Sequence, residues 1–183
     1  MIQPTISALR GGGGIRGGAA LLAVLLAGFL AIQAASAQEK RVMGWVEKVR
    51  IDPEGLVLAA KLDSGAEHCS LHAARVTQFT RGGQTWVRFE VPNDHGERRI
   101  LERKRVRMAK IKRHHGGSQK RPVVRMGLCI GDVYKVTEVN LVDRAGFKYR
   151  LLIGRKFMEE AVIIDPARMF TVEPACKESP SLE

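Results

Sequence analysis

The sequence predicts a mainly β protein, a barrel with one or two short helices. Short apolar segments alternate with polar residues, as in residues 86–91, where Val87, Phe89 and Val91 share one face. Glycine and proline turn signals separate these segments. No segment carries the long 3.6-residue periodicity of a major helix.

The first half of the domain is predicted as strands joined by tight turns. Strands are expected at 42–51 and 56–62, separated by the turn signal Asp52-Pro53-Glu54-Gly55. The second of these is apolar on both faces, which predicts a fully buried strand. Residues 68–79 are expected to form a short strand and then a helical turn. Residues 86–91 and 98–108 are expected to pair as antiparallel strands around a turn at 92–96.

The second half repeats this pattern. A basic stretch at 110–121 precedes a predicted hairpin of strands 123–130 and 133–142, with Gly131-Asp132 as its two-residue turn. Further strands are expected at 148–153, at 161–165, where Pro166 ends the strand, and at 170–172. One or two helical turns are expected at 155–160.

The first 37 residues have the features of a secretory signal peptide. Arg10 and Arg16 are basic, residues 19–32 are apolar but shorter than the roughly 20 residues that span a membrane, and Ala35-Ser36-Ala37 is a small-residue cleavage site. An uncleaved N-terminal anchor is the alternative. We expect an exported protein, periplasmic or secreted, with a short lead at 38–43, one domain at 44–172 and a polar tail at 173–183.

The exported part is strongly basic. The chain carries a net charge of +11, and removal of Arg10 and Arg16 with the signal peptide leaves +9. Such a surplus favours anionic partners, such as acidic peptides or an anionic envelope surface. A dense basic run lies at 98–113, but it lacks the interleaved aromatic residues of nucleic-acid binding, so no nucleic-acid partner is expected.

Three cysteines remain after export, so at most one disulfide forms within a monomer. Their pairing stays open. Cys129 belongs to the alternating pattern of the predicted strand 123–130 and is expected to be a small buried apolar residue. Cys176 lies in the polar tail and is expected to be freer to react, and Cys69 follows the motif described next.

The main chemical motif is Asp63-Ser64-Gly65-Ala66, directly after the apolar strand 56–62. A carboxylate at the end of a buried strand needs compensating contacts. One alternative is a structural aspartate that caps a turn. Catalysis by carboxylates needs two of them sharing one proton, and the chain contains this motif once. A catalytic pair therefore requires two copies of Asp63 across a twofold axis.

Together with the later segment Leu152-Ile153-Gly154-Arg155, this motif resembles the retropepsin-like aspartic peptidases. The resemblance implies a closed acid-protease barrel, a homodimer and a peptide substrate. It implies that Asp63 is catalytic, that Ser64, Gly65 and Ala66 form its supporting loop, and that residues 152–155 pack behind that loop. It also places a flap over the substrate at residues 110–121, with its tip at His114, His115, Gly116 and Gly117.

A bacterial branch of this superfamily, labelled "ATP-dependent zinc protease", is more similar still. The shared segments include Gly44-Trp45, Leu71-His72-Ala73 and Ile164-Asp165-Pro166, and they cover residues 44–172. Several of these genes are associated with ATP-grasp ligases that add glutamate to peptides, which implies an acidic peptide. The chain has neither a phosphate-binding Gly-rich loop ending in Gly-Lys-Ser/Thr nor a His-Glu-x-x-His motif. We therefore expect no cofactor and no metal.

Two other chemistries were weighed at His68, Cys69 and His72. A zinc site there would need two more ligands, and a Cys69–His72 nucleophile would need a third, orienting group. The expected function is thus an exported aspartic endopeptidase that acts as a homodimer on a possibly acidic peptide. The alternatives are a non-catalytic envelope protein that binds an anionic polymer or membrane surface through its basic strand, and a zinc-dependent hydrolase.

Overall fold

A computed structural model of the chain describes residues 39–112 and 117–177, so the predicted signal peptide lies outside the described residues. No helix within these ranges has the length and apolar character needed to cross a membrane. The elements are β1 (Arg41–Asp52), β2 (Leu56–Leu62), β3 (Cys69–His72), β4 (Ala74–Arg81), β5 (Gln84–Pro92), β6 (Arg98–Lys112), β7 (Ser118–Ile130), β8 (Val133–Val142), β9 (Leu151–Ile153), α2 (Arg155–Met158) and β10 (Val162–Met169).

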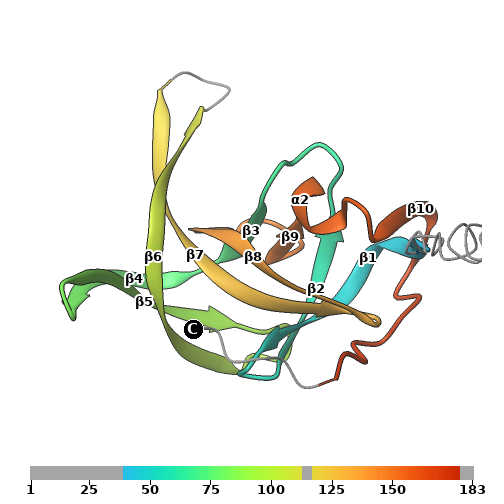
Figure 1. The fold of residues 1–183 in the computed structure, drawn as a ribbon, viewed down its shortest axis with the longest axis horizontal. Coiled ribbons are helices and arrows are strands. Elements are labelled where there is room, and N and C mark those ends of the chain that lie inside the picture. The colour runs from blue at the N-terminus through green and yellow to red at the C-terminus, as the bar shows by residue number, and fades with distance from the viewer. Residues whose placement is uncertain (1–38, 113–116, 178–183) are drawn as a thin grey trace, which may run out of the picture. The chain divides into compact units, whose positions relative to one another are not determined.

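Six of the strands close into a barrel, which confirms the predicted fold class (Figure 1). Their order is β1, β2, β9, β3, β8 and β7, and β7 pairs again with β1 to complete the circle. Closure pairs Arg50 with Cys129 and Ile51 with Leu128. A closed barrel leaves no free edge between these strands.

The barrel interior is filled from alternate positions along each strand. In β2, Leu56, Leu58 and Leu62 are at most 3% exposed, whereas Val57 is 38% exposed. The prediction that β2 is buried on both faces is therefore wrong. A strand in a single closed layer has one face toward the interior and the other toward solvent, whatever its composition.

Three strands extend the sheet beyond the barrel. β6 pairs with β7, β5 with β6 and β4 with β5, and β6 and β7 form the long hairpin of Figure 1. The predicted helical turn within 68–79 is wrong, because β4 follows β3 after one residue and pairs with β5. Phe79 lies opposite Trp86 in this pairing, and such aromatic pairs favour a strand. The predicted face of Val87, Phe89 and Val91 is confirmed, since each is at most 1% exposed.

The last strand differs from its prediction. β10 runs parallel to β1 and continues through Pro166 to Met169 instead of ending at residue 165. Proline is tolerated there because β10 is the outermost strand of the sheet, where a missing N–H breaks no ladder bond on the open side. Residues 170–172 form no strand, which corrects the prediction of a final short one.

Residues 170–176 instead form a C-terminal strap that is fixed to the barrel. Glu47, on β1, is fully buried, and its carboxylate accepts hydrogen bonds from the backbone N–H of Gly44, at 2.6 Å, and of Thr171, at 3.0 Å. The Thr171 hydroxyl and the Val172 N–H donate to the same carboxylate. These donors compensate for the burial of the charge.

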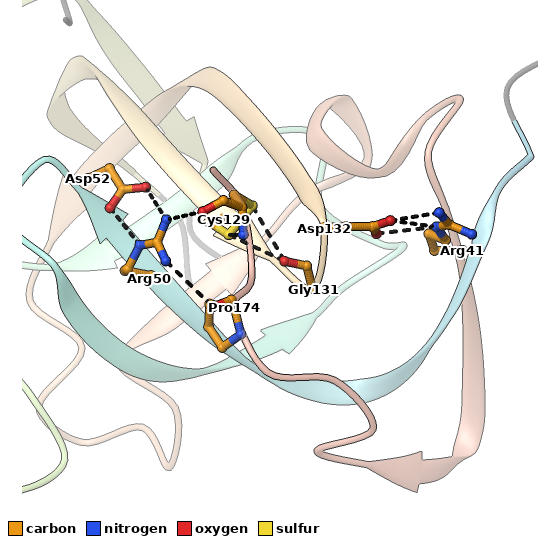
Figure 2. The surroundings of a disulfide bond; sticks show 8 residues. Arg41, Arg50, Asp52, Cys129, Gly131, Asp132 and Pro174 are labelled. Carbon is orange, nitrogen blue, oxygen red and sulfur yellow. Dashed lines mark hydrogen bonds and ion pairs between the residues drawn. A yellow bond between two sulfur atoms is a disulfide. The ribbon is translucent and has the colours of Figure 1, made fainter. Parts of the chain in front are cut away.

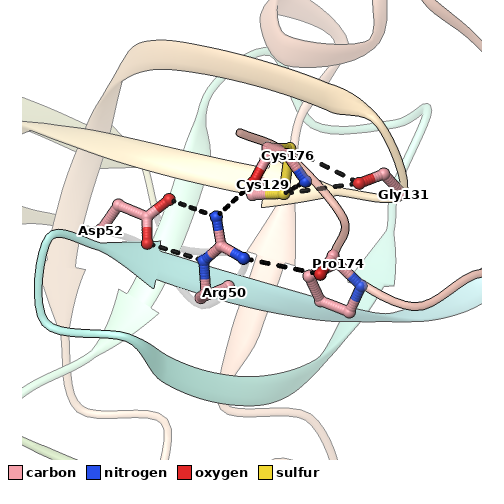
Figure 3. A network of polar contacts seen from close by, with 6 residues as sticks. All are labelled: Arg50, Asp52, Cys129, Gly131, Pro174 and Cys176. Atoms are coloured by element: carbon pink, nitrogen blue, oxygen red, sulfur yellow. Dashed lines mark hydrogen bonds and ion pairs between the residues drawn. A yellow bond between two sulfur atoms is a disulfide. The ribbon is translucent and has the colours of Figure 1, made fainter. Parts of the chain in front are cut away.

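A disulfide fixes the far end of the strap. Cys129 in β7 is bonded to Cys176, 47 residues later (Figure 2). Figure 3 shows the Arg50 guanidinium between the Asp52 carboxylate and the carbonyl oxygens of Pro174 and Cys176. Cys129 is fully buried, as predicted, and the disulfide decides the pairing that the sequence left open. The expectation that Cys176 is freer to react is wrong, because its sulfur is bonded to Cys129.

Candidate active site

The Asp63 loop begins where β2 ends and is held by β9. β9 runs parallel to β2, with Leu62 opposite Ile153. The backbone N–H of Asp63 then donates to the carbonyl of Ile153 at 2.9 Å. The two sequence motifs, about ninety residues apart, are therefore joined directly by strand pairing.

The loop itself is a tight turn around the Asp63 side chain. The Gly65 N–H donates to Asp63 Oδ1 at 3.0 Å, and the Ala66 N–H donates to the Asp63 carbonyl at 3.1 Å. The second carboxylate oxygen, Oδ2, lies 3.4 Å from Lys61 Nζ, and the Asp63 side chain is 25% exposed. One oxygen is thus fixed by the turn, while the side chain as a whole stays accessible.

Gly154 and Arg155 fasten this loop from behind. A Cβ on Gly154 would lie 2.5 Å from the backbone carbon of His68, so only glycine fits. The Arg155 N–H donates to the Ala66 carbonyl and its Nη1 donates to the Ser64 carbonyl, both at 2.8 Å. The structure therefore brings the predicted supporting segment, residues 152–155, against the predicted loop, residues 63–66.

Ser64 is exposed, and among the described residues no partner of its hydroxyl is found. Only its backbone carbonyl is engaged, by Arg155. This leaves the hydroxyl available to a group outside the protomer.

Two clefts flank the loop. The helix cleft, of about 590 Å³, is lined by Asp63 and Ser64 together with β10 and α2. The hairpin cleft, of about 500 Å³, lies between Ala66 and the β6–β7 hairpin. The predicted flap is continuous with this hairpin, because Lys112 pairs with Ser118 at its end. The flap residues His114, His115 and Gly116 lie outside the described residues, and Gly117 precedes β7 with a positive φ of 74°.

Among the charged side chains of the hairpin cleft, the basic ones predominate. Arg107, Lys110, Arg121 and Arg144 line it, together with His68 and with Glu67 as the acidic member. Burial lowers the pKa of Arg144, and the neighbouring Arg121 charge lowers it further, whereas the Asp63 carboxylate opposes the shift. Arg144 therefore lies within electrostatic reach of the motif aspartate.

The cysteine next to the motif is unsuited to nucleophilic chemistry. Cys69 is 1% exposed, and burial raises the pKa of its thiol to about 11, although the Gly154 N–H donates to the sulfur. His72 accepts the Arg144 backbone N–H at Nδ1, so it is not directed at the sulfur. No group of three or more metal-ligating side chains occurs within residues 39–112 and 117–177.

A family model described as "Retropepsin-like aspartic endopeptidase RimB" matches residues 42–175. The chain belongs to the RimB-like family. This bears out the resemblance on which the sequence analysis relied.

The chain is also similar to individual proteins. The chain is 34% identical to a probable alpha-L-glutamate ligase of Shewanella pealeana, covering 62% of this chain and 25% of the ligase. It is 33% identical to one from Desulfotalea psychrophila, covering 76% and 31%. The chain thus spans about a quarter to a third of the length of these curated relatives. Protein Lpg0085 of Legionella pneumophila, a solved structure, is 36% identical with a TM-score of 0.63, covering 73% of this chain and 98% of that one.

The sequence analysis did not identify the two arginines that line the cleft beside the Asp63 loop. Arg121 lies within the basic stretch that the sequence analysis assigned to the flap, and Arg144 belongs to none of the predicted site segments. Arg121 follows Lys120 in that basic stretch, whereas Arg144 is an isolated cation, and both are separated from Asp63 by many residues. The β7–β8 hairpin was predicted from its turn, but the proximity of these arginines to the Asp63 loop also requires the pairing of β3 with β8, for which the sequence carries no local signal.

Proposed function

We propose that the protein is an exported aspartic endopeptidase, in which two protomers each contribute one Asp63. The observation that carries the proposal is the loop geometry. Asp63 ends a barrel strand, the Gly65 N–H holds one of its oxygens, and a quarter of its side chain remains accessible. A single carboxylate in this position lacks a partner for acid–base chemistry, which a second copy of the chain supplies.

The two carboxyl groups share one proton in this mechanism. The ionised member takes a proton from water, the water oxygen attacks the scissile carbonyl carbon, and the protonated member donates a hydrogen bond to the carbonyl oxygen. The resulting tetrahedral intermediate breaks its C–N bond as the amine nitrogen receives the proton that the carboxylate took from water, which leaves one proton shared between the two carboxyl groups. The turn that fixes Asp63, together with Arg155 behind it, reduces the reorganisation needed to bring the two carboxyl groups together.

The charge of the clefts supports an acidic peptide as substrate. Arg107, Arg121 and Arg144 line the hairpin cleft, and the exported part carries a surplus of nine positive charges. The curated relatives are named glutamate ligases, which fits the same substrate class. The predicted signal peptide and the Cys129–Cys176 disulfide support export, because disulfides persist in oxidising compartments.

Peptide cleavage by residues 38–183 tests the proposal. A fluorogenic glutamate-rich peptide is incubated at pH 4–7 with the wild-type protein and with Asp63→Asn, which removes the acid while keeping the shape. Activity that resists a chelator, responds to an aspartic-peptidase inhibitor and disappears in Asp63→Asn supports the proposal. Activity lost to the chelator favours the zinc hydrolase. Absence of activity, with salt-sensitive binding to anionic vesicles, favours the envelope-binding alternative.

A further inference from the structure

The hairpin cleft contains a preorganised pair of arginines beside the catalytic loop. Arg121 comes from β7 and Arg144 from the loop that follows β8, and both line the cleft. Arg121 donates to the side-chain oxygen of Asn140 at 3.0 Å. Asn140 is 8% exposed and is fixed in turn by its donation to the Cys69 carbonyl at 2.6 Å. A buried amide therefore sets the position of one guanidinium.

Arg144 is held by neutral groups. Its Nε donates to the Tyr149 carbonyl at 3.3 Å, and its guanidinium lies 4.6 Å from the centre of the Phe147 ring. Its backbone N–H donates to His72 at 2.8 Å. No carboxylate of the described residues forms an ion pair with Arg144 within 4 Å.

This arrangement distinguishes Arg144 from two arginines of β6 that have acidic partners. Arg103 pairs with Glu54, and Arg107, in the same cleft, pairs with Glu138 at 2.6 Å. Arg144 is half-buried, and burial lowers its pKa, with the like charge of Arg121 adding to the shift and the Asp63 carboxylate opposing it. Two partly buried guanidinium groups that line one cleft repel each other, and an anion bound between them relieves that repulsion.

We infer that Arg144 and Arg121 form a subsite for a carboxylate of the substrate, next to the scissile bond. The inference rests on the proposed function and assigns residues to its specificity. The planar guanidinium matches a carboxylate with two parallel hydrogen bonds. Because Ala66 of the catalytic loop lines the same cleft, the bound carboxylate belongs to a residue close to the cleaved bond. It is either a glutamate or aspartate side chain or the C-terminal carboxylate of the peptide.

The test compares Arg144→Gln with wild type on matched peptides. One series replaces a single glutamate by glutamine on either side of the cleavage point, and a second carries a C-terminal amide in place of the acid. For the acidic peptide we expect Arg144→Gln to lower kcat/KM about tenfold or more, mainly through KM, and to leave the cleavage of the matched neutral peptide unchanged. If Arg144→Gln leaves cleavage of the glutamine peptide unchanged, the bound carboxylate is a side chain. If it leaves cleavage of the amidated peptide unchanged, the bound carboxylate is the C-terminal one.

Arg125→Gln is the matched control, because Arg125 lies on β7 with Arg121 but is exposed and outside the cleft. It removes the same charge and should change kcat/KM less than threefold. Arg144→Lys keeps the charge without the fork and should fall between wild type and Arg144→Gln. The subsite assignment is overturned if Arg144→Gln slows acidic and neutral peptides by the same factor, or slows neither.

A binding measurement keeps this assignment separate from catalysis. Calorimetry compares the Asp63→Asn protein with the double variant Asp63→Asn/Arg144→Gln. The double variant should bind the uncleaved acidic peptide more weakly and the neutral peptide equally well. If wild type cleaves nothing, the proposed function fails, and this binding difference still decides the subsite. Equal binding of acidic and neutral peptides by Asp63→Asn rejects it.

Discussion

The disulfide between Cys129 and Cys176 should contribute a large share of the protein's stability. It closes a loop with a sequence separation of 47 residues, and the chain-entropy model assigns such a loop about 4 kcal/mol. The strap is also attached by the hydrogen bonds to Glu47, which persist after the bond is broken. We therefore expect the measured loss to be about 2–4 kcal/mol.

Urea unfolding of residues 38–183 measures this loss. Wild type is compared with the Cys129→Ala/Cys176→Ala variant, each with and without reductant. The midpoint of wild type should fall on reduction, whereas the variant should be insensitive to reductant and resemble reduced wild type. Cys69 is present in every sample, so its thiol cancels from the comparison. An oxidised wild type within about 0.5 kcal/mol of the double variant would refute the loop-closure reasoning.

Two further predictions concern the loop and its surroundings. Gly154→Ala places a Cβ 2.5 Å from the backbone of His68, so we expect the free energy of unfolding to fall by about 1–3 kcal/mol. The proposed peptidase activity should fall by a larger proportion, because the displaced backbone carries the Asp63 loop. Unchanged stability would show that the loop tolerates the shift. The pKa of His72 is lowered below 6.5, chiefly by burial, with the Arg150 and Arg144 charges adding to the shift and Asp143 opposing it. The unfolded chain therefore binds this proton at a higher pH than the folded one, and stability should fall as the pH drops below about 6.5. His72→Asn keeps an acceptor for the Arg144 N–H but does not titrate, so its melting temperature should depend less on pH over that window. Identical pH profiles would exclude His72 as the source.

The sequence predicted most of the barrel, because its signals are local. The Asp52-Pro53-Glu54-Gly55 turn, the hairpin at Gly131-Asp132 and the alternation around Phe89 each depend on neighbouring residues, and each was found as predicted. The loop at Asp63 was likewise marked by a motif and by the strand before it.

The features that were missed depend on distant residues. β10 continues through Pro166 only because its outer edge is open, and the pairing of Cys129 with Cys176 depends on the path of the strap. The burial of Glu47 could not be predicted from its neighbours in sequence, since its partners Thr171 and Val172 lie more than 120 residues away. The arginines of the hairpin cleft converge for the same reason.

The parallel pairing of β1 with β10 has a consequence for the order of folding. Arg41 lies opposite Val162, so β1 finds one of its neighbours only after the chain has been synthesised beyond Val162. Contacts of such long range slow the search for the native state. A nascent chain with this order of strands therefore lacks its complete sheet until β10 has been synthesised.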